Sequence, residues 1–257
     1  MPHPHSPRVP AWPPRSAPRL FVERELGKGV TLTVEGQQAH YLLRVMRVGE
    51  GDAVILCDNR TGEWAARVLG ADKRKLTLEA SERLRAREDV PDFWLCPALL
   101  KKDRFDLVLE KATELGIAKI APLVTRRCVA DRLNMDRARA LVIEAAEQCA
   151  RTALPILASP VKLEELLRDW PLDRHLFLAD ELAPENGGLP AAGVFSAHTG
   201  PAAILTGPEG GFDDAERAMI RAHPAARSIS LGPRILRGET AAIAAVALWM
   251  GVRGDWA

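Results

Sequence analysis

The spacing of apolar residues changes near residue 90, and this change constrains the fold more than any other feature of the sequence. Before this point, short runs predict β-strands, and after it strand-like and helix-like runs follow one another. The charged residues 83–89, followed by Pro91, separate the two patterns and are typical of a linker. The sequence therefore predicts one domain at residues 19–85 and a second at residues 90–257.

The first domain is predicted to be a small β-barrel module. Its strand-like runs surround one segment, residues 37–48, in which apolar side chains recur at helical spacing. The predicted strands are residues 20–23, 31–35, 53–58, 63–69 and 75–80. Ahead of this domain, seven prolines among the first 18 residues predict a disordered tail at residues 1–18.

The second domain is predicted to be of the α/β class. Its predicted strands are residues 93–98, 119–124, 175–179, 202–206 and 227–231, and its predicted helices are residues 103–115, 136–152, 161–169, 213–222 and 239–252. Such alternation predicts a mostly parallel sheet with helices on both faces. Two helix ends carry local signals, since Gly116 stands at a left-handed cap position and Asp213 with Glu216 forms an acidic capping box.

Composition excludes several classes of protein. Of the 257 residues, 47% are hydrophobic and 27% are charged, which predicts a packed core. No apolar run approaches the ~20 residues of a membrane span, and the N-terminus lacks the apolar core of a signal peptide, so we expect a cytoplasmic protein without membrane contact. The cysteines stand singly, which favours core thiols over a metal site: Cys57, Cys96, Cys128 and Cys149.

Two segments near the C-terminus carry the most information about function. Residues 202–206 form an apolar strand that opens into G-P-E-G-G-F at residues 207–212, just before the capped helix. Glycines there let a backbone approach a ligand, although an ordinary tight turn explains the loop equally well. The second segment, residues 230–241, reads S-L-G-P-R-I-L-R-G-E-T-A and leads into an alanine-rich helix. Its charged residues are equally compatible with a solvated turn.

Taken together, these two segments resemble the signature of the SPOUT superfamily, and most closely the 16S ribosomal RNA uridine-N3 methyltransferases. The likeness extends over residues 19–253 and includes residues 40–47, 101–116 and 144–151. Only the proline-rich tail falls outside it. The sequence departs from the family pattern at Gly238, where a larger residue is usual, and at Cys149, where serine is common.

The resemblance implies an N-terminal PUA-like RNA-binding β-barrel and a C-terminal SPOUT α/β domain. It also implies a deep trefoil knot at about residues 200–253, a homodimer, and S-adenosyl-L-methionine as the cofactor. The implied substrate is N3 of a uridine in 16S rRNA, presented by the small ribosomal subunit. Two alternatives remain: another SPOUT RNA methyltransferase (ribose 2′-O or guanine N1), or a non-enzymatic RNA-binding assembly factor.

The resemblance also assigns roles to residues of this sequence. The expected cofactor contacts lie in three loops and at the start of the last helix: Leu178, Ala179, Asp180, Thr206, Gly207, Pro208, Glu209, Gly210, Gly211, Ile229, Ser230, Leu231, Gly232, Pro233, Ile235, Leu236, Thr240 and Ala241. Catalytic candidates are the titratable and cationic groups of the two segments: Glu209, Glu239, Arg234 and Arg237. The expected RNA contacts are Arg19, Arg44, Arg47, Lys101 and Arg151, for which ordinary surface charge or an ion pair is the competing explanation.

Overall fold

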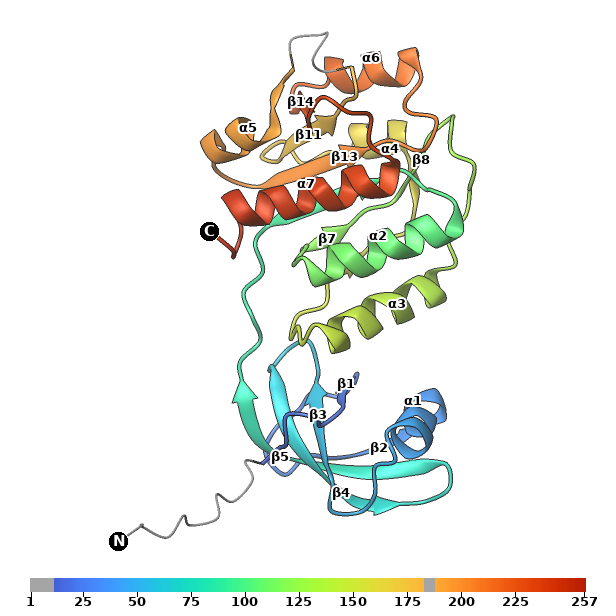
Figure 1. The fold of residues 1–257 in the computed structure, drawn as a ribbon, viewed down its shortest axis with the longest axis vertical. Coiled ribbons are helices and arrows are strands. Elements are labelled where there is room, and N and C mark those ends of the chain that lie inside the picture. Colours follow the sequence, from blue (N-terminus) through green and yellow to red (C-terminus); the bar gives the residue numbers. More distant parts are fainter. Residues whose placement is uncertain (1–11, 183–187) are drawn as a thin grey trace, which may run out of the picture. The chain divides into compact units, whose positions relative to one another are not determined.

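The computed structural model describes residues 12–182 and 188–257, so residues 1–11 of the predicted tail lie outside the described residues. The chain divides into two compact units (Figure 1). The first ends at Glu88 and also includes Ala150–Ala153, and the second contains Asp89–Cys149 and Leu154–Ala257. The short segment belongs to the first unit because Glu88 accepts hydrogen bonds from the backbone N–H groups of Thr152 (3.1 Å) and Ala153 (3.0 Å).

The first unit is built on a five-stranded, half-barrel sheet. Its elements are β1 (Arg19–Phe21), β2 (Thr31–Glu35), α1 (Gly36–His40), the π-helical turn η1 (Tyr41–Val45), β3 (Ala53–Cys57), β4 (Glu63–Ala71) and β5 (Lys75–Arg85). The strand order is β1-β3-β4-β5-β2, so among the described residues no ladder closes the sheet between β1 and β2. Leu42, Leu56 and Leu76 are fully buried in the core between the sheet and the helical segment.

The helical segment of this unit differs from the single helix predicted at residues 37–48. It widens into η1, where the N–H of Met46 donates to the carbonyl of Tyr41 across five residues. Arg47 then adopts a left-handed backbone conformation, with φ at 54°. The described end of the proline-rich segment contacts the sheet, because Pro18 accepts a hydrogen bond from the N–H of Ile55 at 2.8 Å.

The second unit is an α/β domain around a seven-stranded, wholly parallel sheet. Its strands are β6 (Phe93–Pro97), β7 (Lys119–Ile120), β8 (Leu123–Val124), β9 (Ile156–Leu157), β10 (Val161–Lys162), β11 (His175–Ala179), β12 (Leu189–Pro190), β13 (Ala202–Thr206) and β14 (Ala226–Ser230). Its helices are α2 (Lys102–Glu114), α3 (Met135–Gln148), α4 (Leu163–Arg168), α5 (Ala191–Ala197), α6 (Asp214–Ala222) and α7 (Gly238–Val252). The sheet order is β12-β14-β11-β13-β6-β7-β9, and β8 pairs with β10 separately.

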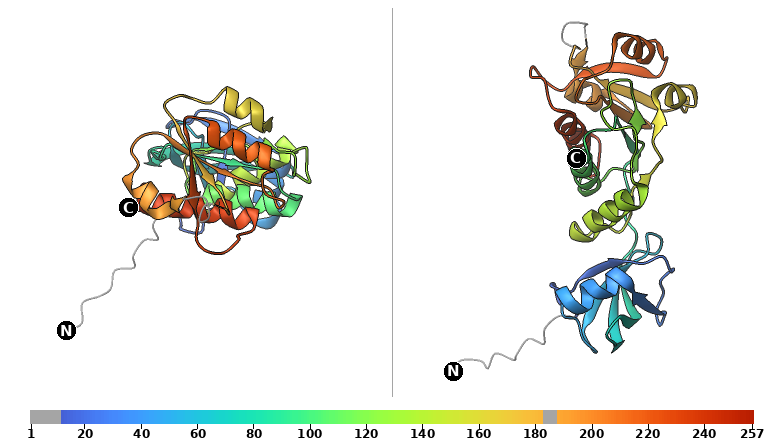
Figure 2. Two further views of the ribbon diagram at one scale, coloured as in Figure 1. Left: turned by 90° about the horizontal axis from the view of Figure 1, so that it is seen from above. Right: turned by 90° about the vertical axis from the view of Figure 1, so that its right-hand side faces the viewer.

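Helices cover both faces of this sheet, as Figure 2 shows. Successive residues of a strand point to opposite faces, so Ile204 packs among α2, α5 and α7, whereas Leu205 packs toward α4 and α6. Both side chains are fully buried. The continuous apolar run of β13 therefore reflects a strand buried on both sides, which confirms the predicted parallel sheet.

Local signals for helix ends are also confirmed. Gly116 has φ at 94° directly after α2, and Asp213 with Glu216 forms a complete capping box on α6. The helix predicted at residues 136–152 is wrong at its end: α3 stops at Gln148, because Ala150 turns into the left-handed region with φ at 60°. Helix α5 was not predicted. No helix among the described residues is long and apolar enough to span a membrane.

Candidate functional site

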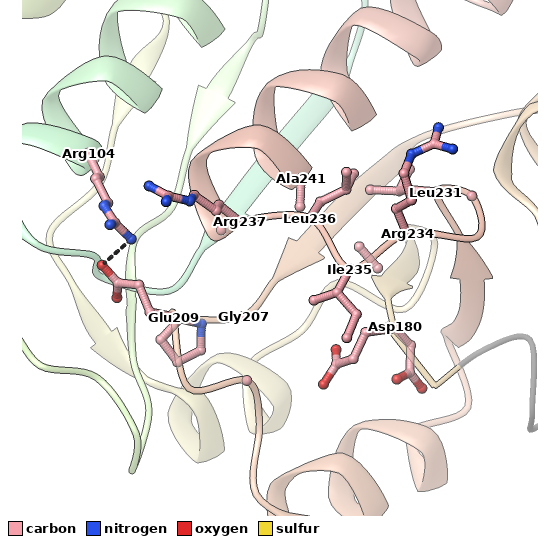
Figure 3. A pocket seen from close by; sticks show the side chains of 16 residues that line it. Arg104, Asp180, Gly207, Glu209, Leu231, Arg234, Ile235, Leu236, Arg237 and Ala241 are labelled. Atoms are coloured by element: carbon pink, nitrogen blue, oxygen red, sulfur yellow. Dashed lines mark ion pairs between the residues drawn. The ribbon is translucent and has the colours of Figure 1, made fainter.

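A cavity of about 250 Å³ lies where the parallel strands β11, β13 and β14 end (Figure 3). The loops that follow these strands form its walls, together with the start of α7 and one side chain from α2. This edge of a parallel sheet is where ligands of α/β proteins bind. The cavity is lined by Arg104, Ala179, Asp180, Glu181, Gly207, Pro208, Glu209, Gly211, Leu231, Gly232, Arg234, Ile235, Leu236, Arg237, Gly238 and Ala241.

The loop after β13, residues 207–212, requires glycine for steric and conformational reasons. Gly211 has φ at 65°, which side chains rarely allow, and a Cβ on Gly207 would lie 3.2 Å from the ring of Phe212. From outside, the Arg127 guanidinium donates to the carbonyl of Gly210 at 3.0 Å. The loop is therefore held in one conformation, with its backbone along the cavity wall.

The second glycine-bearing loop, residues 231–238, meets the first at Gly238. A Cβ on Gly238 would lie 3.1 Å from the carbonyl oxygen of Gly207 and 2.8 Å from Cδ2 of Leu100. The start of α7 therefore passes directly beside the β13 loop. The small side chains of α7 let this helix pack closely against the sheet, since Ala242 and Ala245 are fully buried in the core that also contains residues of β6 and β13.

On one side of the cavity, a guanidinium from α2 joins the β13 loop to the first turn of α7. Arg104 Nη1 lies 3.5 Å from Oε1 of Glu209, and its Nε lies 3.8 Å from Oε1 of Glu239. The backbone N–H of Lys101 also donates to Oε1 of Glu209, at 3.1 Å. The Oε2 atoms of both glutamates are buried and have no hydrogen-bond partner among the described residues. Arg237 lies on the same side in Figure 3.

On the opposite side, Asp180 anchors the loop after β11. Its carboxylate is completely buried and pairs with both Arg217 and Arg221 of α6. Arg217 also pairs with Glu181 at 2.9 Å and donates to the carbonyl of Phe212 at 3.2 Å. Burial acts to lower the pKa of Arg217, but the hydrogen bonds and negative charges of Glu181 and Asp180 together outweigh it and raise the pKa. One arginine thus ties the β11 loop to the end of the β13 loop.

The structure brings together most of the predicted cofactor residues, and three of the four catalytic candidates, around one cavity. Of the catalytic candidates, Glu209, Arg234 and Arg237 line it, whereas Glu239 does not line it and pairs with Arg104. The predicted cofactor residues that do not line it are Leu178, Thr206, Gly210, Ile229, Ser230, Pro233 and Thr240. Several of these have a structural role: Leu178, Thr206 and Ile229 are buried in strands, and the Ser230 hydroxyl accepts from the N–H of Gly232 at 3.2 Å.

Sequence reasoning missed three residues that line the cavity. Arg104 was within a quoted family segment but received no role, because its carboxylate partners lie more than 100 residues away in sequence. Glu181 follows Asp180 directly, and its pairing with Arg217 of α6 had no local signal. Gly238 was treated as a departure from the family pattern, whereas its Cβ position is crowded by Leu100 and Gly207.

The predicted RNA contacts have varied environments. Arg44 and Arg47 are exposed on the first unit, and the Lys101 side chain is exposed at the start of α2. Arg19 is engaged in an ion pair with Glu63 at 3.0 Å. Arg151 is buried and pairs with Glu88 at 3.4 Å, and it lies beyond the end of α3. Direct contact between Arg151 and RNA would require that pair to open.

Within the described part of the chain, no group of three His, Cys, Asp or Glu residues is arranged to hold a metal ion. Cys57 and Cys96 are buried, which raises the pKa of each thiol to about 12. Both thiols are therefore protonated near neutral pH and unsuited to nucleophilic chemistry.

Comparison with known proteins assigns the chain to a family. A model of the RNA methyltransferase domain matches residues 87–250, and a model of the RNA methyltransferase PUA domain matches residues 34–81. The ribosomal RNA small subunit methyltransferase E of Rickettsia conorii is 32% identical over 231 residues, which cover 89% of this chain and 93% of that protein. The chain belongs to the ribosomal RNA small subunit methyltransferase E family.

Solved structures agree with this family assignment. A putative methyltransferase from Legionella pneumophila, in complex with the bound cofactor SAM, has a TM-score of 0.83 and 28% identity, covering 93% of this chain and 99% of that one. A ribosomal RNA small subunit methyltransferase E from Neisseria gonorrhoeae, bound to S-adenosyl methionine, has a TM-score of 0.82 and 27% identity, covering 94% and 100%. In this member of the methyltransferase E family, every residue that lines the cavity falls within the matched methyltransferase domain.

Proposed function

We propose that this protein is an S-adenosylmethionine-dependent methyltransferase that modifies N3 of one uridine in 16S rRNA of the small ribosomal subunit. The observation that carries the proposal is the single cavity enclosed by the two glycine-bearing loops, at the carboxyl ends of β11, β13 and β14. Relatives that cover nearly the whole chain are named for methylation of small-subunit ribosomal RNA, and two similar structures contain the cofactor.

The residues of the cavity fit this cofactor. Glycines at positions 207, 211 and 232 expose backbone groups to it, and Leu231, Ile235 and Leu236 supply apolar contacts for an adenine ring. Glu209 lines the cavity, and its buried Oε2, which has no hydrogen-bond partner among the described residues, suits a ligand with hydrogen-bond donors. We propose these loop residues, with Ala179, Asp180 and Ala241, as the cofactor contacts. When bound, S-adenosylmethionine supplies a methyl group on a sulfonium.

The protein's part in the reaction is to position the base and to handle one proton. Uracil N3 carries an imide proton, which must leave as the new N–C bond forms. Glu209, which lines the cavity, accepts it in this proposal, whereas Glu239, outside the lining, acts through its pairing with Arg104. Arg237, exposed at the cavity rim, stabilises negative charge on the flanking carbonyls. Arg234 is proposed for the same role. Holding both reactants in line contributes a large part of the rate.

The target uridine must be unpaired or extruded, because pairing hides N3. Arg44, Arg47 and Lys101 are the proposed phosphate contacts, since their side chains are exposed. Arg19 and Arg151, engaged by Glu63 and Glu88, contribute only if those ion pairs open. The cytoplasm, where ribosomal subunits are found, is the proposed location, and residues 19–85 and 90–257 are the proposed domains.

A knot and a homodimer are also part of the proposal. Support for the knot comes from the chain path: β14 lies on the other side of β11 from β13, yet α7 begins against Gly207 of the β13 loop. The connecting segment, residues 231–237, must therefore pass the loop after β11 to reach the loop after β13. Ile235, which is 86% exposed beside the cavity, is a candidate for a contact between two copies of the chain.

The decisive experiment maps methyl groups on ribosomal RNA. Small-subunit RNA from cells with and without this protein is digested and analysed by mass spectrometry, and loss of one N3-methyluridine is the expected result. A missing ribose 2′-O or guanine N1 methyl group would identify a different RNA methyltransferase. Calorimetry with S-adenosylmethionine tests the binding-factor alternative, for which no heat of binding is expected.

A further inference from the structure

A second groove, on the first unit, is lined by aromatic and cationic side chains that the proposed reaction leaves without a role. It has a volume of about 620 Å³. Its lining residues are Trp12, Lys28, Trp64, Arg67, Ser81, Glu82 and Arg83, and we call it the Trp12 groove. Trp12 belongs to the proline-rich segment outside the family resemblance. None of these residues is among the predicted RNA contacts.

An irregularity in the sheet forms the floor of the groove. Ala65 of β4 is paired with Glu82 of β5, and Ala66 with Ala80, so Ser81 is an extra residue in β5. Such a bulge changes the direction in which neighbouring side chains point. The Ser81 hydroxyl donates to the carbonyl of Ala65 at 3.0 Å, which fixes the bulge.

Trp12 is held over this floor by an arginine. Trp12 as a whole residue is 38% exposed, and the Arg67 guanidinium lies 5.0 Å from the ring centroid, within the range of a cation–π contact. Arg67 also donates to the carbonyl of Gly51 at 3.1 Å, so the guanidinium is fixed from two directions. The arrangement gives an exposed aromatic surface on an ordered support.

The groove carries a net positive charge. Lys28, Arg67 and Arg83 are exposed, and within the described residues none of them forms an ion pair with a carboxylate. Glu82 is the one acidic side chain that lines the groove. By contrast, Arg19 and Arg85 of the same sheet both pair with Glu63.

We infer that the Trp12 groove binds a single-stranded segment of RNA, with a base stacked on Trp12 and phosphates near Lys28 and Arg83. Exposed aromatic rings interleaved with free cations are the features by which proteins hold unpaired RNA, because every base has a face that can stack. The inference rests on the proposed function for the identity of the polymer, and it adds a contact remote in sequence from the cofactor loops. It also gives the proline-rich segment a role.

The test measures binding of a fluorescein-labelled 12-nucleotide single-stranded RNA to the full chain by anisotropy. Trp12→Ala is expected to weaken binding by about 5- to 100-fold, and Trp12→Phe to restore most of it, because loss of one stacked base has roughly this effect. Lys28→Gln/Arg83→Gln is expected to weaken binding and to reduce the slope of log K against log salt by about 1.4, for two phosphate contacts.

Two control variants match these changes. Trp256→Ala removes another exposed tryptophan, in the second unit, and Arg60→Gln removes a cation of the first unit that is paired with Glu25. Both should bind as the wild type does. The inference is overturned if either Trp12→Ala or the double cation variant binds within twofold of the wild type. Failure of the proposed function would appear separately, as absence of methyl transfer by the wild-type chain.

Discussion

Replacing Arg104 by methionine tests whether one guanidinium holds the two cofactor loops in register. The Arg104 side chain is 33% exposed, whereas those of Glu209 and Glu239 are 19% and 12% exposed. At an effective dielectric constant of 20, each attraction at these distances is worth at most about 4–5 kcal/mol. Solvent screens the one-third exposed Arg104, and burying the ion pairs costs desolvation free energy. The net stabilisation lost on removing Arg104 is therefore about 2 kcal/mol.

This loss should appear in catalysis because Glu209 lines the cavity and Glu239 stands in the first turn of α7, next to the lining residue Gly238. A loss of about 2 kcal/mol corresponds to a fall of roughly 30-fold in kcat/KM for methyl transfer to small ribosomal subunits. Removing Arg104 also leaves two largely buried carboxylates without their shared cation. We therefore expect Arg104→Met/Glu239→Gln to regain part of the lost activity, a recovery that independent effects would not give.

The matched control is Arg139→Met, which removes an exposed arginine of α3 paired with Asp136. It should leave kcat/KM unchanged. Arg104→Lys should retain an intermediate activity, because an ammonium reaches one carboxylate but lacks the fork that spans two. The reasoning is refuted if kcat/KM of Arg104→Met stays within threefold of the wild type. It is also refuted if adding Glu239→Gln to Arg104→Met lowers kcat/KM further by the full factor that Glu239→Gln causes alone.

Three further predictions concern separate parts of the second unit. Arg237→Ala should lower kcat by roughly 10- to 100-fold with little change in calorimetric cofactor affinity; a loss of affinity at unchanged kcat would instead make Arg237 a cofactor ligand. Gly238→Ala should lower the free energy of unfolding by about 1 kcal/mol, and less in a Leu100→Ala background, because its Cβ meets Leu100; equal losses in both backgrounds would exclude that contact. Burial and the neighbouring His175 lower the pKa of His198 in the folded chain. As the pH falls through 6.5, His198 is therefore protonated in the unfolded chain before it is protonated in the folded chain. Stability should therefore decline below that pH, and His198→Gln should weaken the decline in denaturant titrations; an identical pH dependence would contradict this.

Much of the fold could be predicted from periodicity, because the sequence signals for its main strands and helices lie within short stretches of the chain. The run of β13 and the capping box of α6 are complete within about ten residues of sequence. Short elements such as β9 and β12 could not be predicted in this way. Each has two residues, and it is a strand only because a distant neighbour pairs with it.

The same distinction applies to the candidate site. Its glycines could be identified because tight loops need them, and these positions do lie around one cavity. The charged contacts that fix the loops join residues far apart in sequence, as in the pairing of Arg217 with Asp180 or of Arg104 with Glu209. A single sequence carries no local signal for such pairs, so only the structure could supply them.

Gly238 illustrates how a local argument can be correct and still incomplete. By helix propensity alone, glycine at the first position of α7 costs roughly 1 kcal/mol relative to alanine. In the structure, glycine allows α7 to begin close to the β13 loop, because a Cβ at this position would lie only 3.1 Å from the carbonyl oxygen of Gly207. The unfavourable propensity is thus offset by contact between two loops that enclose the cavity. A residue that looks like a weakness in the sequence therefore contributes to the closure of the site.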